Sequence, residues 1–153
     1  MHHRRHSMAT AAATLCLVVL AACGGADATA QFKSGYAAAR GPLNRTFNAV
    51  VKTLSAARGK SAAQIAGTVG ALADRFGSEV DSIRALKPPA SVATAFATLR
   101  ASLDRVEGDL RRISLAAKGK DLAGAELALE NLGSDSRSAS EAGAVVKQKL
   151  YPS

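Results

Sequence analysis

The chain has 153 residues, of which 20 are lysine or arginine and 12 are aspartate or glutamate, so its formal net charge is +8. Hydrophobic residues make up 48% of it, and it has three histidines, two cysteines and no tryptophan. A chain of this size and apolar content can form one domain with a buried core. Because histidine and cysteine are so scarce, the location of these few residues decides which kinds of chemistry are excluded.

The first 22 residues have the form of an export signal. A basic start at residues 1–6 precedes an apolar run at 9–22 that ends in small residues. This run is too short to cross a bilayer, which needs roughly 20 apolar residues, so the alternative of an N-terminal anchor helix that stays in place is disfavoured. We therefore expect residues 1–22 to be removed as a signal peptide.

The end of this run, Leu20-Ala21-Ala22-Cys23, resembles the lipobox of bacterial lipoproteins. The resemblance covers the first 23 residues. It implies that the sulfur of Cys23 carries a diacylglyceryl group, that cleavage falls just before this residue, and that its new amino group is acylated. Several acyl chains together give stable anchoring. The expected location is the extracytoplasmic side of the cell membrane; the alternative is a Cys23 that is simply a small buried residue.

Cleavage would remove His2, His3 and His6, together with Cys16 and both methionines. Subtraction of Arg4 and Arg5 from the 20 basic residues leaves 18 against 12 acidic ones, a net charge of +6. Without histidine, the mature chain cannot form a Ser-His catalytic pair or the Glu-x-x-His motifs of di-metal bundles. We therefore expect no enzyme activity, no metal and no cofactor other than the lipid on Cys23.

From residue 31 onward the hydrophobic pattern predicts an all-α chain. We expect a lipidated flexible tether at 23–30 and then a domain at 31–151, with helices at about 31–58, 61–86, 89–118 and 121–150. Short connections favour an antiparallel up-down four-helix bundle. The clearest apolar stripe follows the alternating three- and four-residue spacing of a coiled-coil seam. It comprises Val92, Phe96, Leu99, Leu103, Val106, Leu110 and Ile113.

Local signals support these helix ends. Ser61 and Gln64 form a capping-box pattern, and Asp121 can cap the fourth helix. Gly59 and Gly119 suit left-handed caps at helix ends. Pro88-Pro89 should end the second helix and start the third.

Two further features stand out within the helices. Pro42 predicts a kink or a break in the first helix. The fourth stripe is the weakest: it comprises Leu122, Ala125, Leu129, Leu132, Ala139, Val146 and Leu150, with small residues at 136 and 143.

Small residues on the fourth helix raise the question of a binding surface. The alanine-rich seam predicts a narrow core without a large cavity, although Ser136, Ala139 and Gly143 leave room for a groove or a partner-binding face. The alternative is close contact with a neighbouring helix. The segment Leu86-Lys87-Pro88-Pro89-Ala90, followed by the heptad helix, is similar to small helical lipoproteins from bacteria with alanine- and arginine-rich proteins; this likeness implies no functional residues.

The charged residues suggest two further hypotheses. Arg111 and Arg112 are candidates for contact with anionic lipids or wall polymers, whereas nucleic acid is not expected because no aromatic residues alternate with the arginines. Glu126 and Glu130 lie one helical turn apart and keep open a hydrolase that works through carboxylates.

The sequence thus predicts a membrane-anchored, non-catalytic module that binds a cell-envelope protein through an exposed helix face. The alternative is a carrier or sensor of a small apolar or anionic ligand in the bundle seam.

The lipid anchor can be tested directly. Cys23→Ala should abolish acylation and release the protein from the membrane fraction, because it removes the sulfur that carries the lipid. Mass spectrometry of the extracted chain measures the first effect and fractionation the second. A variant that still carries acyl chains would refute the assignment.

Overall fold

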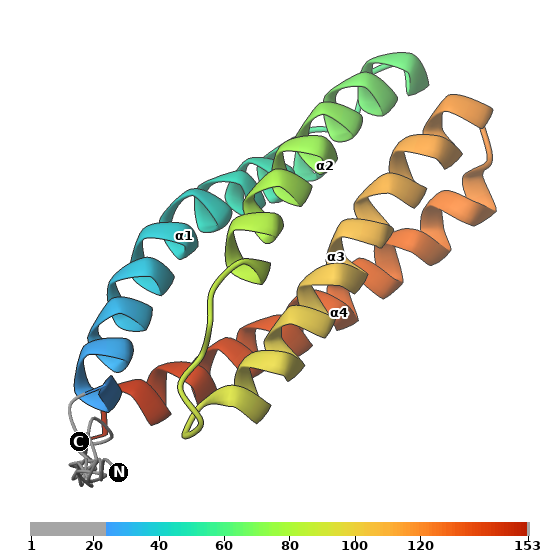
Figure 1. Ribbon diagram of the computed structural model, residues 1–153. Coiled ribbons are helices and arrows are strands. Elements are labelled where there is room, and N and C mark those ends of the chain that lie inside the picture. Colours follow the sequence, from blue (N-terminus) through green and yellow to red (C-terminus); the bar gives the residue numbers. More distant parts are fainter. Residues whose placement is uncertain (1–23, 153) are drawn as a thin grey trace, which may run out of the picture.

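The computed structural model describes residues 24–152, which form four helices (Figure 1). They are α1 (Gly24–Ser55), α2 (Ala62–Arg84), α3 (Ala93–Gly119) and α4 (Leu122–Leu150). The helices alternate in direction, so the α1–α2 and α3–α4 turns lie at one end of the bundle. The α2–α3 connection and both ends of the described chain lie at the other (Figure 1). The predicted all-α four-helix fold is confirmed.

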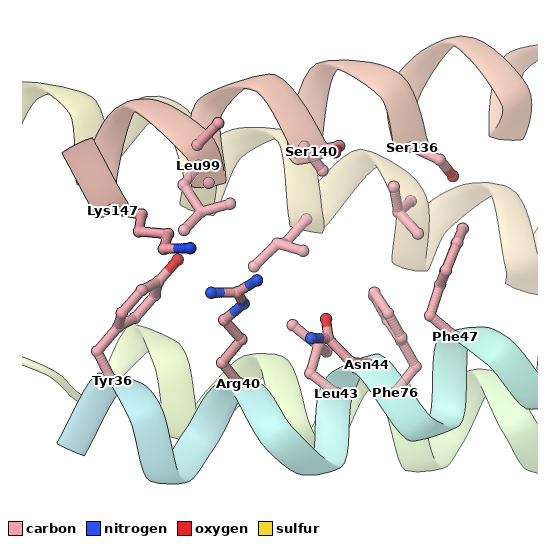
Figure 2. Close-up of a pocket in the computed structure, with 15 residues that line it drawn as sticks. Tyr36, Arg40, Leu43, Asn44, Phe47, Phe76, Leu99, Ser136, Ser140 and Lys147 are labelled. Atoms are coloured by element: carbon pink, nitrogen blue, oxygen red, sulfur yellow. The ribbon is translucent and has the colours of Figure 1, made fainter. Parts of the chain in front are cut away.

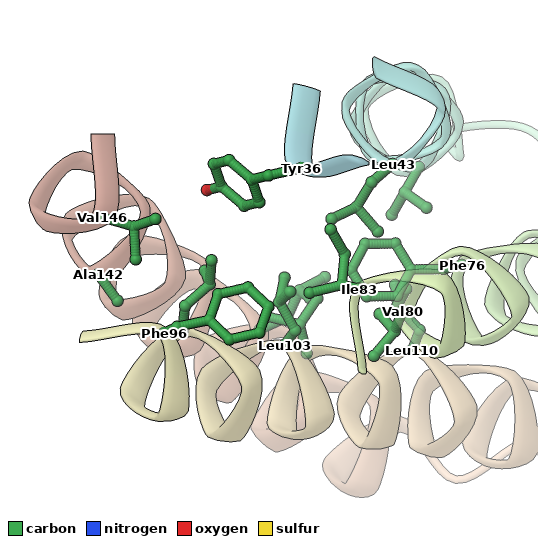
Figure 3. Close-up of a cluster of buried hydrophobic side chains, with 14 of the residues drawn as sticks. Tyr36, Leu43, Phe76, Val80, Ile83, Phe96, Leu103, Leu110, Ala142 and Val146 are labelled. Atoms are coloured by element: carbon green, nitrogen blue, oxygen red, sulfur yellow. The ribbon is translucent and has the colours of Figure 1, made fainter. Parts of the chain in front are cut away.

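The core is organised around α3. Every residue of the predicted seam from Val92 to Ile113 is buried, with at most 5% of its surface exposed. Around it pack buried side chains from the other helices, including Leu43, Phe76, Val80, Ile83 and Val146 (Figure 3). An aromatic cluster joins α1 to this core, since the ring of Phe96 lies edge-on to Phe32 at 5.0 Å and to Tyr36 at 6.1 Å. Burial of apolar surface in this core is the main force that holds the helices together.

Neighbouring helices in the chain pack on one another in sequence, α1 on α2, α2 on α3 and α3 on α4, whereas α1 and α4 have few contacts. Hydrogen bonds link each sequential pair. The hydroxyl of Thr46 on α1 donates to Glu79 on α2, and Arg84 on α2 donates to Asp104 on α3. Arg105 on α3 donates to Asp135 on α4 at 2.8 Å. The bundle is therefore least closed between its first and last helices.

Two of the expected helix caps are confirmed. Ser61 caps α2 in a capping box with Gln64. Asp121 caps α4 by accepting a hydrogen bond from the backbone of Gly124 at 2.9 Å. Gly59 has the expected left-handed conformation with a φ of 80°, but α1 ends at Ser55 and not at residue 58, so this glycine lies in the turn before α2.

The start of α1 corrects one expectation. Helix α1 begins at Gly24, so residues 24–30 are helical and do not form the flexible tether expected at 23–30. Ala26, Ala28 and Ala30 are strong helix formers, and Asp27 lies in the first turn, where a negative charge is favoured. The same helix continues through Pro42, so the proline does not break it.

The ends of α3 also differ from expectation. Helix α3 begins at Ala93 and not at residue 89, because Pro89 instead opens a turn whose carbonyl accepts a hydrogen bond from the backbone of Val92. At the other end Gly119 is still helical, and Lys120 adopts the left-handed conformation with φ 57°.

The apolar register of α4 was predicted wrongly in its first half. Leu122 and Leu129 are 79% and 42% exposed, while Ala128 is buried. Helix α4 packs mainly on α3, and the exposed leucines lie on a face that no other described helix covers.

The central role of the α3 seam predicts that two alanine substitutions on this helix differ strongly in their effect on the free energy of unfolding. Phe96→Ala should lower the free energy of unfolding by about 3–5 kcal/mol, because it deletes a fully buried ring. Leu115→Ala, on the same helix but 67% exposed, should change it by less than about 0.5 kcal/mol. Urea unfolding followed by circular dichroism measures both, and equal effects would contradict this description of the core.

Candidate ligand groove between α1 and α4

A groove with a volume of about 430 Å³ lies along the open side of the bundle, between α1 and α4 (Figure 2). Its α1 wall comprises Tyr36, Arg40, Leu43, Asn44 and Phe47, and its α4 wall comprises Ser136, Ala139, Ser140, Gly143, Ala144 and Lys147. Leu99, Leu103 and Val106 of α3 and Phe76 of α2 complete the lining.

The groove exists because α4 presents small side chains where it faces α1. At Gly143 an added Cβ would stand 3.8 Å from the Tyr36 hydroxyl and 3.9 Å from Leu99, so a methyl group would fit there without a clash. Ala139 is only partly buried against the core. Larger residues at these positions would fill the space, and their absence leaves it open.

One end of the groove is positively charged. Figure 2 shows the ammonium of Lys147 and the hydroxyl of Tyr36 pointing toward one another, with the guanidinium of Arg40 reaching from α1 toward α4. Burial raises the pKa of the Tyr36 hydroxyl, and the charge of Arg40 opposes this shift only in part. Tyr36 is therefore a protonated hydrogen-bond donor at neutral pH.

The other end is mainly apolar. Phe47, Phe76 and Val106 line it there (Figure 2). The exception is Ser136, whose hydroxyl oxygen is buried yet has no hydrogen-bond partner among the described residues. A buried hydroxyl without a hydrogen-bond partner costs about 1–3 kcal/mol.

The structure places the three candidate residues of the fourth helix, Ser136, Ala139 and Gly143, along one wall of this groove. The groove lies where the sequence left room for one, beside Ser136 and Gly143, and it is open because α1 and α4 have few contacts with one another. Cys23 and the preceding Leu20, Ala21 and Ala22 lie outside the described residues.

The other candidates lie away from the groove. Arg111 forms ion pairs with Glu107 and Asp74, and Arg112 forms one with Asp109. Their charge is therefore partly neutralised within the protein. Glu126 and Glu130 are exposed on α4 and do not line the groove.

Sequence reasoning missed the α1 wall and the charged end. Neither the aromatic residues Tyr36 and Phe47 nor the cations Arg40 and Lys147 were identified as candidates from the sequence. The sequence contained one signal for this site. Four residues spaced seven apart lie on a single face of α4, and their side chains change from large and apolar to small along the helix: Leu122, Leu129, Ser136 and Gly143.

A buried carboxylate lies at a different place, the α3–α4 interface. Asp109 has 0% of its surface exposed, and its Oδ1 accepts a hydrogen bond from Arg112 at 2.8 Å, while its Oδ2 has no partner among the described residues. Burial raises the pKa of Asp109; the hydrogen bond from Arg112 opposes this shift, and the negative charge of Asp135 adds to it.

In the part of the chain that the structure describes, no group of three or more histidine, cysteine or acidic side chains is placed to hold a metal ion. Within the same residues, no helix has the length and hydropathy needed to cross a membrane.

The raised pKa of Asp109 predicts a pH-dependent effect of Asp109→Asn. The folded state binds this proton more tightly than the unfolded state, so the contribution of Asp109 to stability is greatest at low pH and is lost as the pH rises past the ordinary aspartate value of about 4. Asparagine does not ionise, so Asp109→Asn should gain stability relative to the natural protein between pH 4 and pH 7. Thermal unfolding at both pH values measures this difference, and a constant or opposite difference would contradict it.

Comparison of the chain with known protein families, with curated proteins and with solved structures gave no match. Its function is therefore argued from the groove and from the N-terminal sequence.

Proposed function

We propose that this protein is a lipid-anchored, extracytoplasmic binding module without catalytic activity, and that the groove between α1 and α4 is its binding site. The lipobox resemblance at Leu20–Cys23 supports the anchor. The groove supports the binding role and favours a carrier or sensor of a small ligand.

The observation that carries this proposal is the combination of size and lining. A volume of about 430 Å³ lies within the range of roughly 300–1,000 Å³ that small-molecule sites occupy. The lining is mostly apolar, with a few polar groups that converge at one end. Sites of this kind bind an apolar body through the floor and orient it through the polar groups.

The polar groups of the groove argue for binding and against catalysis. Ser136 and Ser140 are the only hydroxyl nucleophiles on the described α4 wall, and neither is hydrogen-bonded to a lysine or carboxylate that could act as a base. The lining contains no acidic residue and no histidine among the described positions.

A second candidate function, docking of a cell-envelope protein, has its own observation. Leu129 and Leu122 are exposed and lie seven and fourteen residues before Ser136, so they continue the groove face of α4 toward the α3–α4 turn. A partner helix laid along this face would cover both leucines and complete the open side of the bundle.

A bulky side chain at Gly143 tests whether the groove is used. Native mass spectrometry of the full acylated chain, extracted mildly from its own membrane, should show a bound small molecule. Gly143→Phe should lose this molecule, because the ring projects into the groove between Tyr36 and Leu99.

The matched control is Gly108→Phe, since a Cβ added at this α3 position would meet nothing within 4 Å and the residue does not line the groove. The control should retain the molecule. Retention by both variants would contradict the ligand site, and a partner protein lost only from Gly143→Phe would support the docking alternative.

A further inference from the structure

We propose that the ligand of this groove is an anionic amphiphile, with an acyl or alkyl chain on the apolar floor and a single carboxylate or phosphate head group held between Arg40 and Lys147. This inference rests on the proposed binding function and specifies its ligand.

The charge at the head-group end carries the first step. Arg40 and Lys147 come from facing helices, and neither forms an ion pair with any described residue. Other arginines, such as Arg84 and Arg105, are held by carboxylates. Because no acidic residue lines the groove in the described chain, the two positive charges are uncompensated there, and a concave site concentrates their field on an anion.

The donors at this end suit an oxyanion. A guanidinium can bind a carboxylate or phosphate through two parallel hydrogen bonds, and an ammonium adds a compact charge. The protonated hydroxyl of Tyr36 supplies a third donor, and Figure 2 shows all three groups directed to the same end of the groove. A cationic or neutral head group would leave these charges without a partner.

The floor determines the rest of the ligand. Leu43, Leu99 and Leu103 form its middle, and Phe47 and Phe76 its far end. These floor side chains offer no hydrogen bonds, and a hydrocarbon chain would gain by leaving water to lie against them. The hydrogen-bonding groups beyond the charged end, Asn44, Ser136 and Ser140, belong to the two walls.

The length of the groove fits a chain-like molecule. Tyr36 and Phe47 are eleven residues apart on α1, as are Lys147 and Ser136 on α4, which corresponds to about 16 Å along each helix. Beyond Phe47 the two helices present Val51 and Leu129, both large apolar residues that are partly exposed. A longer chain can therefore continue past the end of the groove over an apolar surface.

The test uses the full acylated protein in nanodiscs of phosphatidylcholine and three photoactivatable probes with the same alkyl chain and diazirine. The probes end in a carboxylate, a phosphate or a neutral alcohol. After irradiation, mass spectrometry identifies the labelled peptides. The acidic probes should label the groove peptides of α1 and α4 at concentrations at least about threefold lower than the alcohol.

The head-group contact is tested by the double variant Arg40→Ala with Lys147→Ala. It should weaken labelling by the acidic probes about three- to tenfold, as expected for two exposed charge contacts, and leave labelling by the alcohol unchanged. The matched control is Arg45→Ala with Lys149→Ala, which removes the same charge from the same two helices outside the groove and should label like the natural protein.

The outcomes separate the two levels of the proposal. Equal labelling of the groove by all three probes, unaffected by the double variant, would overturn the anionic head group while supporting a groove ligand. Labelling by none of them at the groove would overturn this ligand class, and the Gly143→Phe experiment then decides whether the groove binds anything else. Preference for the carboxylate indicates a free fatty acid, and preference for the phosphate indicates a lipid phosphate.

Discussion

The arrangement of this bundle depends on the apolar seam of α3. Its buried residues lie in the core between α2 and α4, and α3 packs on both of these helices. Helix α3 therefore joins the first two helices of the chain to the last one. Helix α1 reaches it mainly through aromatic contacts to Phe96 near the end of the bundle that carries the termini. These aromatic contacts therefore fix the position of α1 over α3 near Phe32 and Tyr36. Helices α1 and α4, in contrast, have few contacts with one another.

The open side of the bundle follows from this asymmetry and from the composition of α4. A four-helix bundle closes when the facing sides of its first and last helices pack together around the core. Here α4 offers the small residues Ser136, Ala139 and Gly143 on this side, and space remains between the two helices. The resulting groove has the buried Leu99 and Leu103 at its floor, and the Ser136 hydroxyl on its wall has no hydrogen-bond partner among the described residues. Departures from good packing that occur together in one concave place are typical of binding sites.

The sequence predicted the individual helices and their caps better than it predicted how the helices pack on one another. Periodicity identified the α3 seam without error, because residues that must be buried on one face repeat every three or four positions. Capping at Ser61 and Asp121 was readable since it involves neighbours in the chain. The register of α4 was not, because Leu122 and Leu129 look like core residues unless one knows that no helix lies opposite them.

The candidate site shows the same division. The small residues of α4 marked one wall, since a missing side chain is visible in the sequence itself. The charged end was not predictable, because Arg40 and Lys147 are more than a hundred residues apart and resemble ordinary surface cations. Only the antiparallel pairing of α1 and α4 brings them to the same end of the groove.

The proposed anchor and the proposed ligand together constrain how the groove could be loaded. Because α1 begins at Gly24, no described spacer separates the bundle from Cys23, and Tyr36 lies only about 18 Å along the helix from that first residue. With Cys23 as the proposed anchor, the charged end of the groove would be the end nearer the bilayer, and its apolar end would point away. A lipid within the membrane has the opposite orientation, with its head group outward and its chain inward. On these two proposals, an amphiphile would have to enter the groove sideways, through the open side of the bundle between α1 and α4.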